Sequence, residues 1–176
     1  MSNLVFVAKE SVADETRVAA SVETVKKMRG LGFDVVIEAG AGASSRIPDA
    51  EYEAVGARIG SIKDAKAADV ILKVRRPTSK EISGYKSGAI VIAIMDPYGN
   101  EAALAEMARA GLTSFAMELM PRITRAQSMD VLSSQANLAG YQAVIEAAAV
   151  YDRALPMMMT AAGTVPAAKV FVMGAG

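Results

Sequence analysis

Cysteine and histidine are both absent from this sequence of 176 residues. Without cysteine there are no disulfides, no thiolate chemistry and no zinc–thiolate site. Without histidine the chain lacks the commonest metal ligand and the side chain that titrates near neutral pH. We therefore expect no metal site, and we expect any chemistry to use carboxylates, Lys, Arg, hydroxyls, amides or a borrowed cofactor.

An excess of charge is also missing, because 19 Lys and Arg residues balance 19 Asp and Glu residues. No long-range field therefore favours nucleic acid or an anionic membrane surface. Long apolar runs are missing too, since the most apolar stretch, residues 143–173, is interrupted by charged residues and prolines. We expect no transmembrane segment, no export signal at the N-terminus and a packed core built from the 52% of residues that are hydrophobic.

Short runs rich in Val, Ile and Phe recur along the chain, and each is nearly continuous in hydrophobicity, as in strands covered on both faces. These runs are residues 4–8, 33–38, 69–74, 89–94, 112–117 and 169–173. Segments of helical period lie between them at 21–31 and 100–110, where Ser21 and Asn100 are good N-caps. The alternation predicts a doubly wound, mostly parallel Rossmann-like α/β sheet.

The pattern changes after residue 127, because residues 129–154 contain no proline and are dense in strong helix formers. One long helix is predicted there, followed by a linker at 157–164 and a new strand at 169–173. We therefore expect a first α/β domain over 1–127, a long interdomain helix and linker over 128–168, and the truncated start of a second Rossmann domain, which binds NAD, over 169–176.

Glycines follow the last apolar run, where Gly174 and Gly176 begin a G-x-G turn. Such a turn lets the backbone approach the pyrophosphate of a dinucleotide, although glycine pairs after strands are also ordinary turn chemistry. A second glycine-rich stretch, residues 39–45, lacks the Lys-Ser/Thr pair of a P-loop, so we interpret it as a strand-to-helix connection.

A polar segment precedes and enters the predicted long helix. Arg122 and Gln127 come first, and the side chains that follow recur at steps of three or four residues and so share one helix face. They are Asp130, Ser133 or Ser134, Asn137 and Tyr141. Burying such groups unpaired costs on the order of 1–3 kcal/mol each. A ligand's amide and ribose hydroxyls could satisfy them; alternatively, Asp130 caps the helix and the others pair across an interface.

Cations and an acid gather near predicted strand ends, namely Lys9, Glu10, Arg17 and Lys73. Lys73 lies inside the apolar run 70–74, where an ammonium group needs a partner. An anionic substrate is one candidate partner. The other interpretation is an ion pair with Glu10, or a side chain that extends to the edge of the sheet.

Taken together, four stretches resemble the N-terminal part of the α subunit of proton-translocating nicotinamide nucleotide transhydrogenase, a relative of alanine dehydrogenase. The stretches are residues 9–19, 73–77, 121–130, and 156–164 leading to 172–176. The resemblance implies two Rossmann-type domains joined by long helices, NAD(H) as cofactor, a homodimer and an NADP(H)-binding partner component. It further implies a separate membrane component that translocates protons, and a location in the cytoplasm, peripheral to the inner membrane.

The resemblance also assigns roles to individual residues. Arg122, Gln127, Asp130 and Ser133 match the loop that contacts and orients the nicotinamide, and they are the catalytic and cofactor-binding candidates. Gly174 and Gly176 match the pyrophosphate turn as further cofactor-binding candidates. Hydride transfer between two cofactors needs positioning rather than a protein acid or base, which suits a chain without histidine.

Two alternatives remain. An alanine dehydrogenase-like oxidoreductase would use Arg17 and Lys73, which match carboxylate-binding positions, but the place of that family's catalytic histidine reads Met95-Asp96-Pro97. The family's subunit also continues past the point matched by residue 176. We therefore expect the 176-residue chain alone neither to hold NAD(H) tightly nor to transfer hydride, which leaves a docking or dimerisation module as the other alternative.

Overall fold

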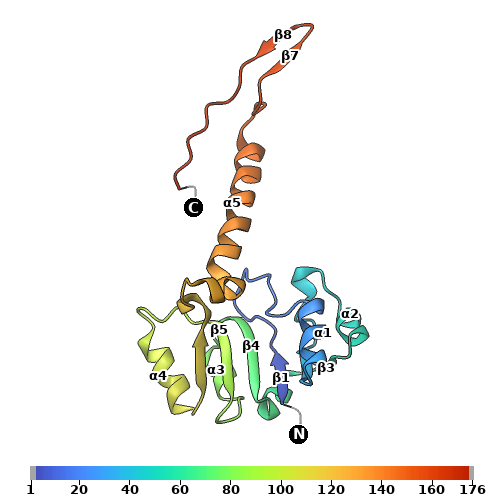
Figure 1. The fold of residues 1–176 in the computed structure, drawn as a ribbon, viewed down its shortest axis with the longest axis vertical. Helices are drawn as coiled ribbons and strands as arrows, with labels where there is room; N and C mark the ends of the chain where they lie inside the picture. Colours follow the sequence, from blue (N-terminus) through green and yellow to red (C-terminus); the bar gives the residue numbers. More distant parts are fainter. Residues whose placement is uncertain (1–2, 175–176) are drawn as a thin grey trace. The chain divides into compact units, whose positions relative to one another are not determined.

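The computed structural model of the chain describes residues 3–174 and divides into two compact units, Met1–Asp130 and Val131–Gly176. The first unit is built on one six-stranded sheet in the order β3-β2-β1-β4-β5-β6, and every neighbouring pair in it is parallel (Figure 1). The strands are β1 (Leu4–Val7), β2 (Asp34–Glu38), β3 (Arg58–Gly60), β4 (Val70–Arg75), β5 (Ile90–Ile94) and β6 (Thr113–Ala116). The predicted doubly wound, Rossmann-like α/β sheet is confirmed.

Helices connect the strands of this sheet, and two further short helices follow β6. The α-helices are α1 (Val22–Gly30), α2 (Asp49–Ala54), α3 (Ser79–Ile82) and α4 (Glu101–Arg109). The 3-10 helices are η1 (Ala43–Ser45), η2 (Ile62–Ala67), η3 (Met117–Leu119) and η4 (Thr124–Met129). The chain builds outward from β1 to β3 and then resumes on the other side of β1 with β4 to β6. The strand order therefore reverses between β1 and β4, which makes the carboxyl ends of these two strands a topological switch point.

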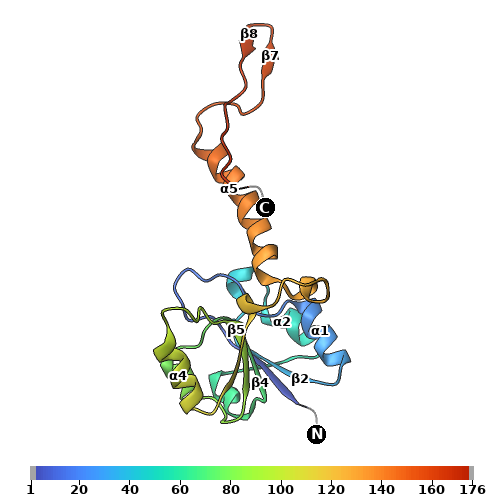
Figure 2. The ribbon, with the colours of Figure 1, turned by 60° about the vertical axis from the view of Figure 1, so that its left-hand side comes forward.

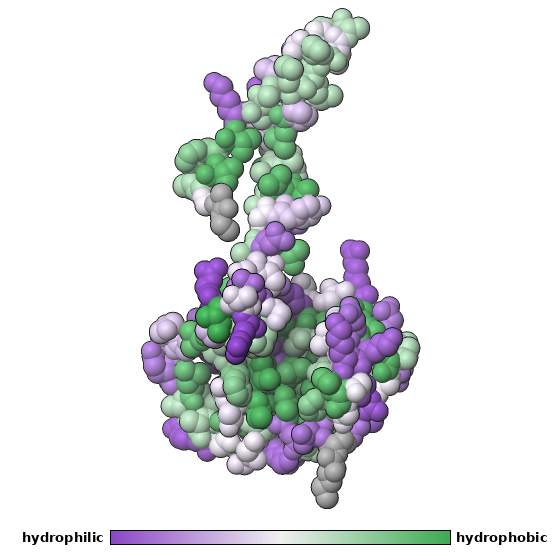
Figure 3. Space-filling view, in the orientation of Figure 1, coloured by the Kyte–Doolittle hydropathy of each residue, from purple (hydrophilic) through white to green (hydrophobic). Residues whose placement is uncertain are grey.

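Helices lie on both sides of the sheet (Figure 2), and an apolar cluster packs on each face. One contains Val25 of α1 and Tyr52 of α2 packed on β1 and β2, and the other contains Ile82 of α3 and Met107 of α4 packed on β4 and β5. In β4 and β5 buried and half-buried residues alternate, so one face of these strands is covered less completely than the other. Figure 3 shows apolar residues gathered over this part of the sheet.

The helix starts show how local sequence sets these boundaries. Ser21 is the N-cap of α1, and its hydroxyl accepts the N–H of Thr24, as the sequence predicts. Asn100 occupies the N-cap position of α4 but makes no capping bond. Its amide instead donates to the Asp96 carbonyl at 2.9 Å and accepts from Arg76 at 3.0 Å, so the competing partners explain the difference.

The second unit contains α5 (Val131–Val150) and an antiparallel hairpin of β7 (Met158–Thr160) and β8 (Gly163–Val165). The helix is shorter than the predicted 129–154, because Asp130 is extended and separates η4 from α5, and because residues 151–153 bend before Pro156. The residues predicted as a linker, 157–164, contain most of this hairpin, in which Met159 and Thr164 face each other. Of the helices in the described part of the chain, none has the length and apolar composition that a bilayer span requires.

The strand predicted at 169–173 does not form, because no other strand pairs with these residues within 3–174. Conversely, the sequence analysis missed β3, which has only three residues, one of them the charged Arg58. The three-part division at residues 127 and 168 stays a prediction.

Candidate functional site

Charged side chains from the loop after β1, from the end of β4 and from α3 form one group at the topological switch point. We call this group the switch-point cluster; it consists of Glu10, Glu15, Arg17, Lys73, Arg75 and Glu81. Ligands of open α/β sheets bind outside the carboxyl ends of the strands at such a point. The cluster is therefore the first place to look for a site in this unit.

Lys73 is at the centre of the buried half of the cluster, and only 1% of its side chain is exposed. Its ammonium donates to Glu81 at 2.6 Å and lies 3.6 Å from the Glu10 carboxylate. The interpretation of Lys73 as an ion-paired residue is therefore the correct one, with Glu81 as an additional partner. Glu81 is held in place by a capping box with Thr78, a Thr-x-x-Glu pattern that is visible in the sequence.

The two carboxylates beside Lys73 differ in their pKa. Burial raises the pKa of Glu10, although the backbone N–H groups of Val74 and Arg75 and the Lys73 ammonium oppose this. Burial also disfavours ionisation of Glu81, but there the hydrogen bonds from Lys73 and Thr78 outweigh it and lower the pKa. The Lys73 ammonium group is thus bound by Glu81 on one side and by Glu10 on the other.

Glu15 organises the outer half of the cluster. Its carboxylate accepts from the Nε and Nη2 of Arg17 at 2.7 and 2.6 Å and from the Nε of Arg75 at 2.8 Å. The hydrogen bonds from Arg17, and then from Arg75, lower the pKa of Glu15 to about 2. Arg17, which matches a carboxylate-binding position in the resemblance, is therefore engaged by a neighbouring acid.

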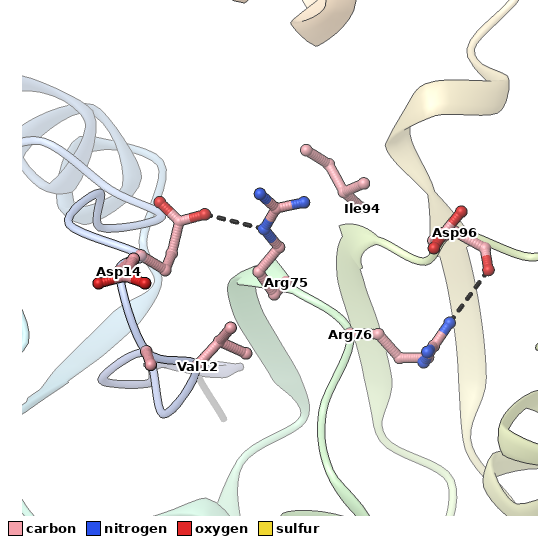
Figure 4. Close-up of a pocket in the computed structure, with 8 residues that line it drawn as sticks. Val12, Asp14, Arg75, Arg76, Ile94 and Asp96 are labelled. Carbon is pink, nitrogen blue, oxygen red and sulfur yellow. Dashed lines mark hydrogen bonds and ion pairs between the residues drawn. The ribbon is translucent and has the colours of Figure 1, made fainter.

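A pocket of about 310 Å³ opens beside the outer half of the cluster. Figure 4 shows Arg75 between Asp14 on one side and Ile94 on the other, with Arg76 directed toward Asp96. Asp14 and Asp96 both have left-handed backbones, with φ of 68° and 48°. This conformation is uncommon for residues other than glycine, although Asp adopts it more readily than most, and contacts with the surrounding structure help to hold it.

The residues that hold the Asp96 backbone in its left-handed conformation lie on both sides of the peptide that joins Met95 to Asp96. The Glu118 carboxylate, in η3, accepts the N–H of Met95 at 3.1 Å and also that of Asp96. The Arg76 guanidinium donates to the Met95 carbonyl and, at 3.0 Å, to the Asp96 carbonyl. The same guanidinium also binds the Asn100 side chain.

The predicted nicotinamide-contacting residues of the first unit lie on one short segment around η4. Arg122 and Gln127 are exposed, and Asp130 is half-buried with its N–H donated to the Gln127 carbonyl at 3.3 Å. Guanidinium and amide N–H groups beside a carboxylate offer the donors and the acceptor that a nicotinamide carboxamide can use. These side chains could therefore hold the amide end of NAD(H).

Ser133 and Gly174 belong to the second unit. Ser133 is exposed in the first turn of α5, and Gly174 has φ of 85°, a conformation that suits glycine. Gly176 lies outside the described residues. The assignment of all these positions to a cofactor site stays a prediction.

The glycine-rich residues 39–45 serve the scaffold, as expected. Gly40 donates its N–H to Asp49 at 3.0 Å, and a Cβ on Gly42 would lie 2.6 Å from the Ile47 carbonyl. The stretch leads through η1 toward α2, and close backbone approach explains the glycine at position 42.

The sequence analysis missed Arg76 and Glu118 as residues that shape this edge of the sheet. Arg76 entered only within a stretch of resemblance, and nothing in the pattern around Glu118 distinguishes it from a surface acid. Its partners are backbone N–H groups 22 and 23 positions away, so no local motif records the contact.

The comparisons with known proteins agree with this architecture. Residues 6–139 match the family model described as "Alanine dehydrogenase/PNT, N-terminal domain", and residues 143–176 match the C-terminal domain model of the same family. The chain is 48% identical over 179 residues to an NAD(P) transhydrogenase subunit alpha of Rhodospirillum rubrum, an alignment that covers 98% of this chain and 47% of that protein.

Solved structures show the same relationship. The crystal structure of a transhydrogenase from Sinorhizobium meliloti superposes with a TM-score of 0.97 at 78% identity, covering 99% of this chain and 52% of that one. An L-alanine dehydrogenase superposes with a TM-score of 0.63 at 28% identity over 65% of this chain and 32% of that one. The chain thus spans about half the length of these two transhydrogenase relatives. On these matches and the shared fold, the chain belongs to the alanine dehydrogenase/PNT family.

Proposed function

We propose that the complete protein is the NAD(H)-binding side of a transhydrogenase that transfers hydride between NAD(H) and NADP(H). The observation that carries the proposal is the exposed segment with Arg122, Gln127 and Asp130, in a chain nearly half identical to a transhydrogenase α subunit. In this proposal a partner component holds NADP(H), and a separate membrane component couples transfer to proton translocation. The chain then works in the cytoplasm, peripheral to the inner membrane, as part of a homodimer.

The roles of the residues follow from their chemistry. The two nicotinamides supply the hydride chemistry when bound, so the protein has to orient them and set their electrostatic environment. Arg122 and Gln127 would donate to the carboxamide oxygen, and Asp130 would accept from the carboxamide nitrogen. Ser133 would contact the same end of the nucleotide, and Gly174 with Gly176 would let the backbone approach the pyrophosphate.

The charged cluster favours this function over an alanine dehydrogenase-like one. A dehydrogenase acting on pyruvate or alanine would need Arg17 and Lys73 to hold the substrate carboxylate. Here Lys73 is bound by Glu81 and Glu10, and Arg17 is bound by Glu15. The place that would carry the catalytic histidine reads Met95-Asp96-Pro97.

The test of the site is kinetic. In the complete protein, mixed with its NADP(H)-binding component, replacement of Arg122, Gln127 or Asp130 by alanine should slow hydride transfer more than it weakens NADH binding. The replacement Lys66→Ala, on η2 and away from this segment, is the control and should leave both quantities unchanged. Unchanged turnover in all three alanine variants would contradict the site assignment.

The 176-residue chain itself offers a second test. Because most of the pyrophosphate site would come from residues beyond the G-x-G turn, we expect titration calorimetry to detect no low-micromolar NADH binding to this chain. Binding at that level would contradict the expectation. Alanine variants would then be compared in the short chain to locate the binding residues.

A further inference from the structure

The peptide between Met95 and Asp96, at the carboxyl end of β5, is held in an unfavourable conformation. Asp96 has φ of 48°, and it precedes Pro97, whose ring restricts the backbone of the preceding residue. This conformation is uncommon before proline, so contacts with the surroundings help to hold it. A structural element that binds this peptide is connected through it to the end of β5.

Two oppositely charged side chains hold this peptide from both of its edges. Glu118 uses its two carboxylate oxygens to accept the N–H groups of Met95 and Asp96, and Arg76 uses one nitrogen to bind their carbonyls. Hydrogen bonds of ionised groups are stronger than neutral ones, and paired contacts fix orientation as well as distance. Arg76 directly follows β4, so its side chain ties the loop after β5 to the neighbouring strand as well.

Glu118 brings a third element into this arrangement, because it lies in η3, just before the segment 121–130 that carries Arg122, Gln127 and Asp130. Within this segment Ala126 is buried, and the N–H groups of Ile123, Ala126 and Asp130 donate to the carbonyls of Pro121, Ile123 and Gln127.

We propose that Glu118 is a positioning residue for the segment 121–130. By binding the backbone of Met95 and Asp96, Glu118 fixes the start of the segment to the end of β5 and so sets where Arg122 and Gln127 present their donors. The consequence for hydride transfer rests on the proposed function. The anchoring itself rests on the contacts alone.

The substitution Glu118→Gln tests the anchoring. The glutamine side chain has nearly the same shape as glutamate but only one accepting oxygen, so its NH2 group would face one of the two backbone N–H donors of Met95 and Asp96. The matched control is Glu106→Gln on α4, where a half-buried glutamate accepts a side-chain hydrogen bond from Ser79 at 2.7 Å. Both variants are made in the complete protein, and amide hydrogen exchange is measured by mass spectrometry on peptides that cover 119–130 and 4–7.

In Glu118→Gln we expect exchange in 121–130 to accelerate on the order of tenfold while the β1 peptide stays slow, because local opening is then easier but global unfolding is not. Glu106→Gln should match the wild type in both peptides. Unchanged exchange in 121–130 would overturn the proposal. An equal acceleration in both peptides would overturn it too, since Glu118 would then only stabilise the unit as a whole.

Kinetic measurements on the same variants in the reconstituted complex test the consequence of the anchoring for hydride transfer. Displaced nicotinamide contacts should lower kcat for hydride transfer roughly tenfold, with the Kd for NADH changed less than about twofold. A normal kcat with faster exchange would overturn the positioning role. If the wild-type complex transfers no hydride, the proposed function fails, and the exchange result still decides the anchoring.

Discussion

Replacing Lys73 with methionine should destabilise the first unit strongly, because it removes the cation shared by two buried carboxylates. The side chains of Lys73, Glu10 and Glu81 are only 1, 3 and 11% exposed. Removing one partner of a buried ion pair costs about 3–5 kcal/mol, since the remaining charge loses its counterion. At about 3 °C per kcal/mol for a chain of this size, the unfolding temperature should fall by about 10–15 °C.

The hydrogen bonds that remain set the lower limit of this estimate. Glu10 keeps the N–H groups of Val74 and Arg75, and Glu81 keeps the N–H and hydroxyl of Thr78 at 2.7 and 2.8 Å. These bonds compensate part of the lost Coulomb energy but leave two like charges near each other. We therefore expect the loss to lie nearer to about 3 than to about 5 kcal/mol.

The loss of stability caused by Lys73→Met should depend on pH in a predictable direction. Burial already raises the pKa of Glu10, and without the ammonium the native state of Lys73→Met favours protonation of the buried carboxylates further. A raised native pKa means that the native state binds protons more tightly than the unfolded chain. The penalty should therefore be complete near about pH 8 and shrink as the pH falls toward about 5.

Urea unfolding followed by far-ultraviolet circular dichroism at several pH values measures both effects. The control is Lys86→Met, because Lys86 pairs with Asp69 at 2.6 Å on the surface, with both side chains more than a third exposed. Exposed pairs contribute about 0–1 kcal/mol. A loss below about 1 kcal/mol for Lys73→Met, or a loss that does not change with pH, would refute the reasoning.

Two further changes test other parts of the unit. The carboxylate of Glu15 has a native pKa of about 2 against an ordinary 4.5, so it stabilises the fold above pH 4.5, and this contribution is lost as the pH falls toward 2. Between pH 4.5 and 2 the free energy of unfolding should therefore fall by about 1–2 kcal/mol more in the wild type than in Glu15→Gln, a value that allows for solvent screening of the exposed partners of Glu15. Equal pH dependence of the two proteins would argue against this role of Glu15. Gly42→Ala should cost about 1–3 kcal/mol in thermal unfolding, because its Cβ would lie 2.6 Å from the Ile47 carbonyl. Gly30→Ala meets nothing within 4 Å and is the control; equal melting temperatures for the two variants would contradict the packing argument.

Sequence reasoning located the sheet because the buried parallel strands are continuous apolar runs, as in Ile90–Ile94. It failed where a strand depends on its partner rather than on its own residues. Arg58–Gly60 pairs along only three residues of β2, and residues 169–173 are as apolar as a strand but have no partner strand among residues 3–174. Pairing is a tertiary property, and hydrophobicity alone does not report it.

Among the charged residues too, the sequence indicates some contacts and not others. The need of Lys73 for a partner followed from its apolar surroundings, whereas the Thr-x-x-Glu pattern of Thr78 and Glu81, although present in the sequence, was not used. Glu118 gave no such signal, because its contacts are to backbone N–H groups that every sequence contains. Glu81 as a partner of Lys73 was likewise visible only in the fold, since the sequence suggested Glu10, a substrate or the edge of the sheet.

The helix α5 carries a consequence for spectroscopy. Every residue from 131 to 150 is exposed or half-buried, including apolar side chains such as Leu138, Val144 and Ile145. A helix of this length with so little of its surface covered is only marginally stable in water, so its helical population should rise on cooling and fall on warming well below the melting of the sheet. If a partner covered these apolar side chains, the gradual loss of helix on warming below the melting temperature of the sheet would disappear. The shape of the thermal baseline is therefore a label-free reporter of whatever associates with α5.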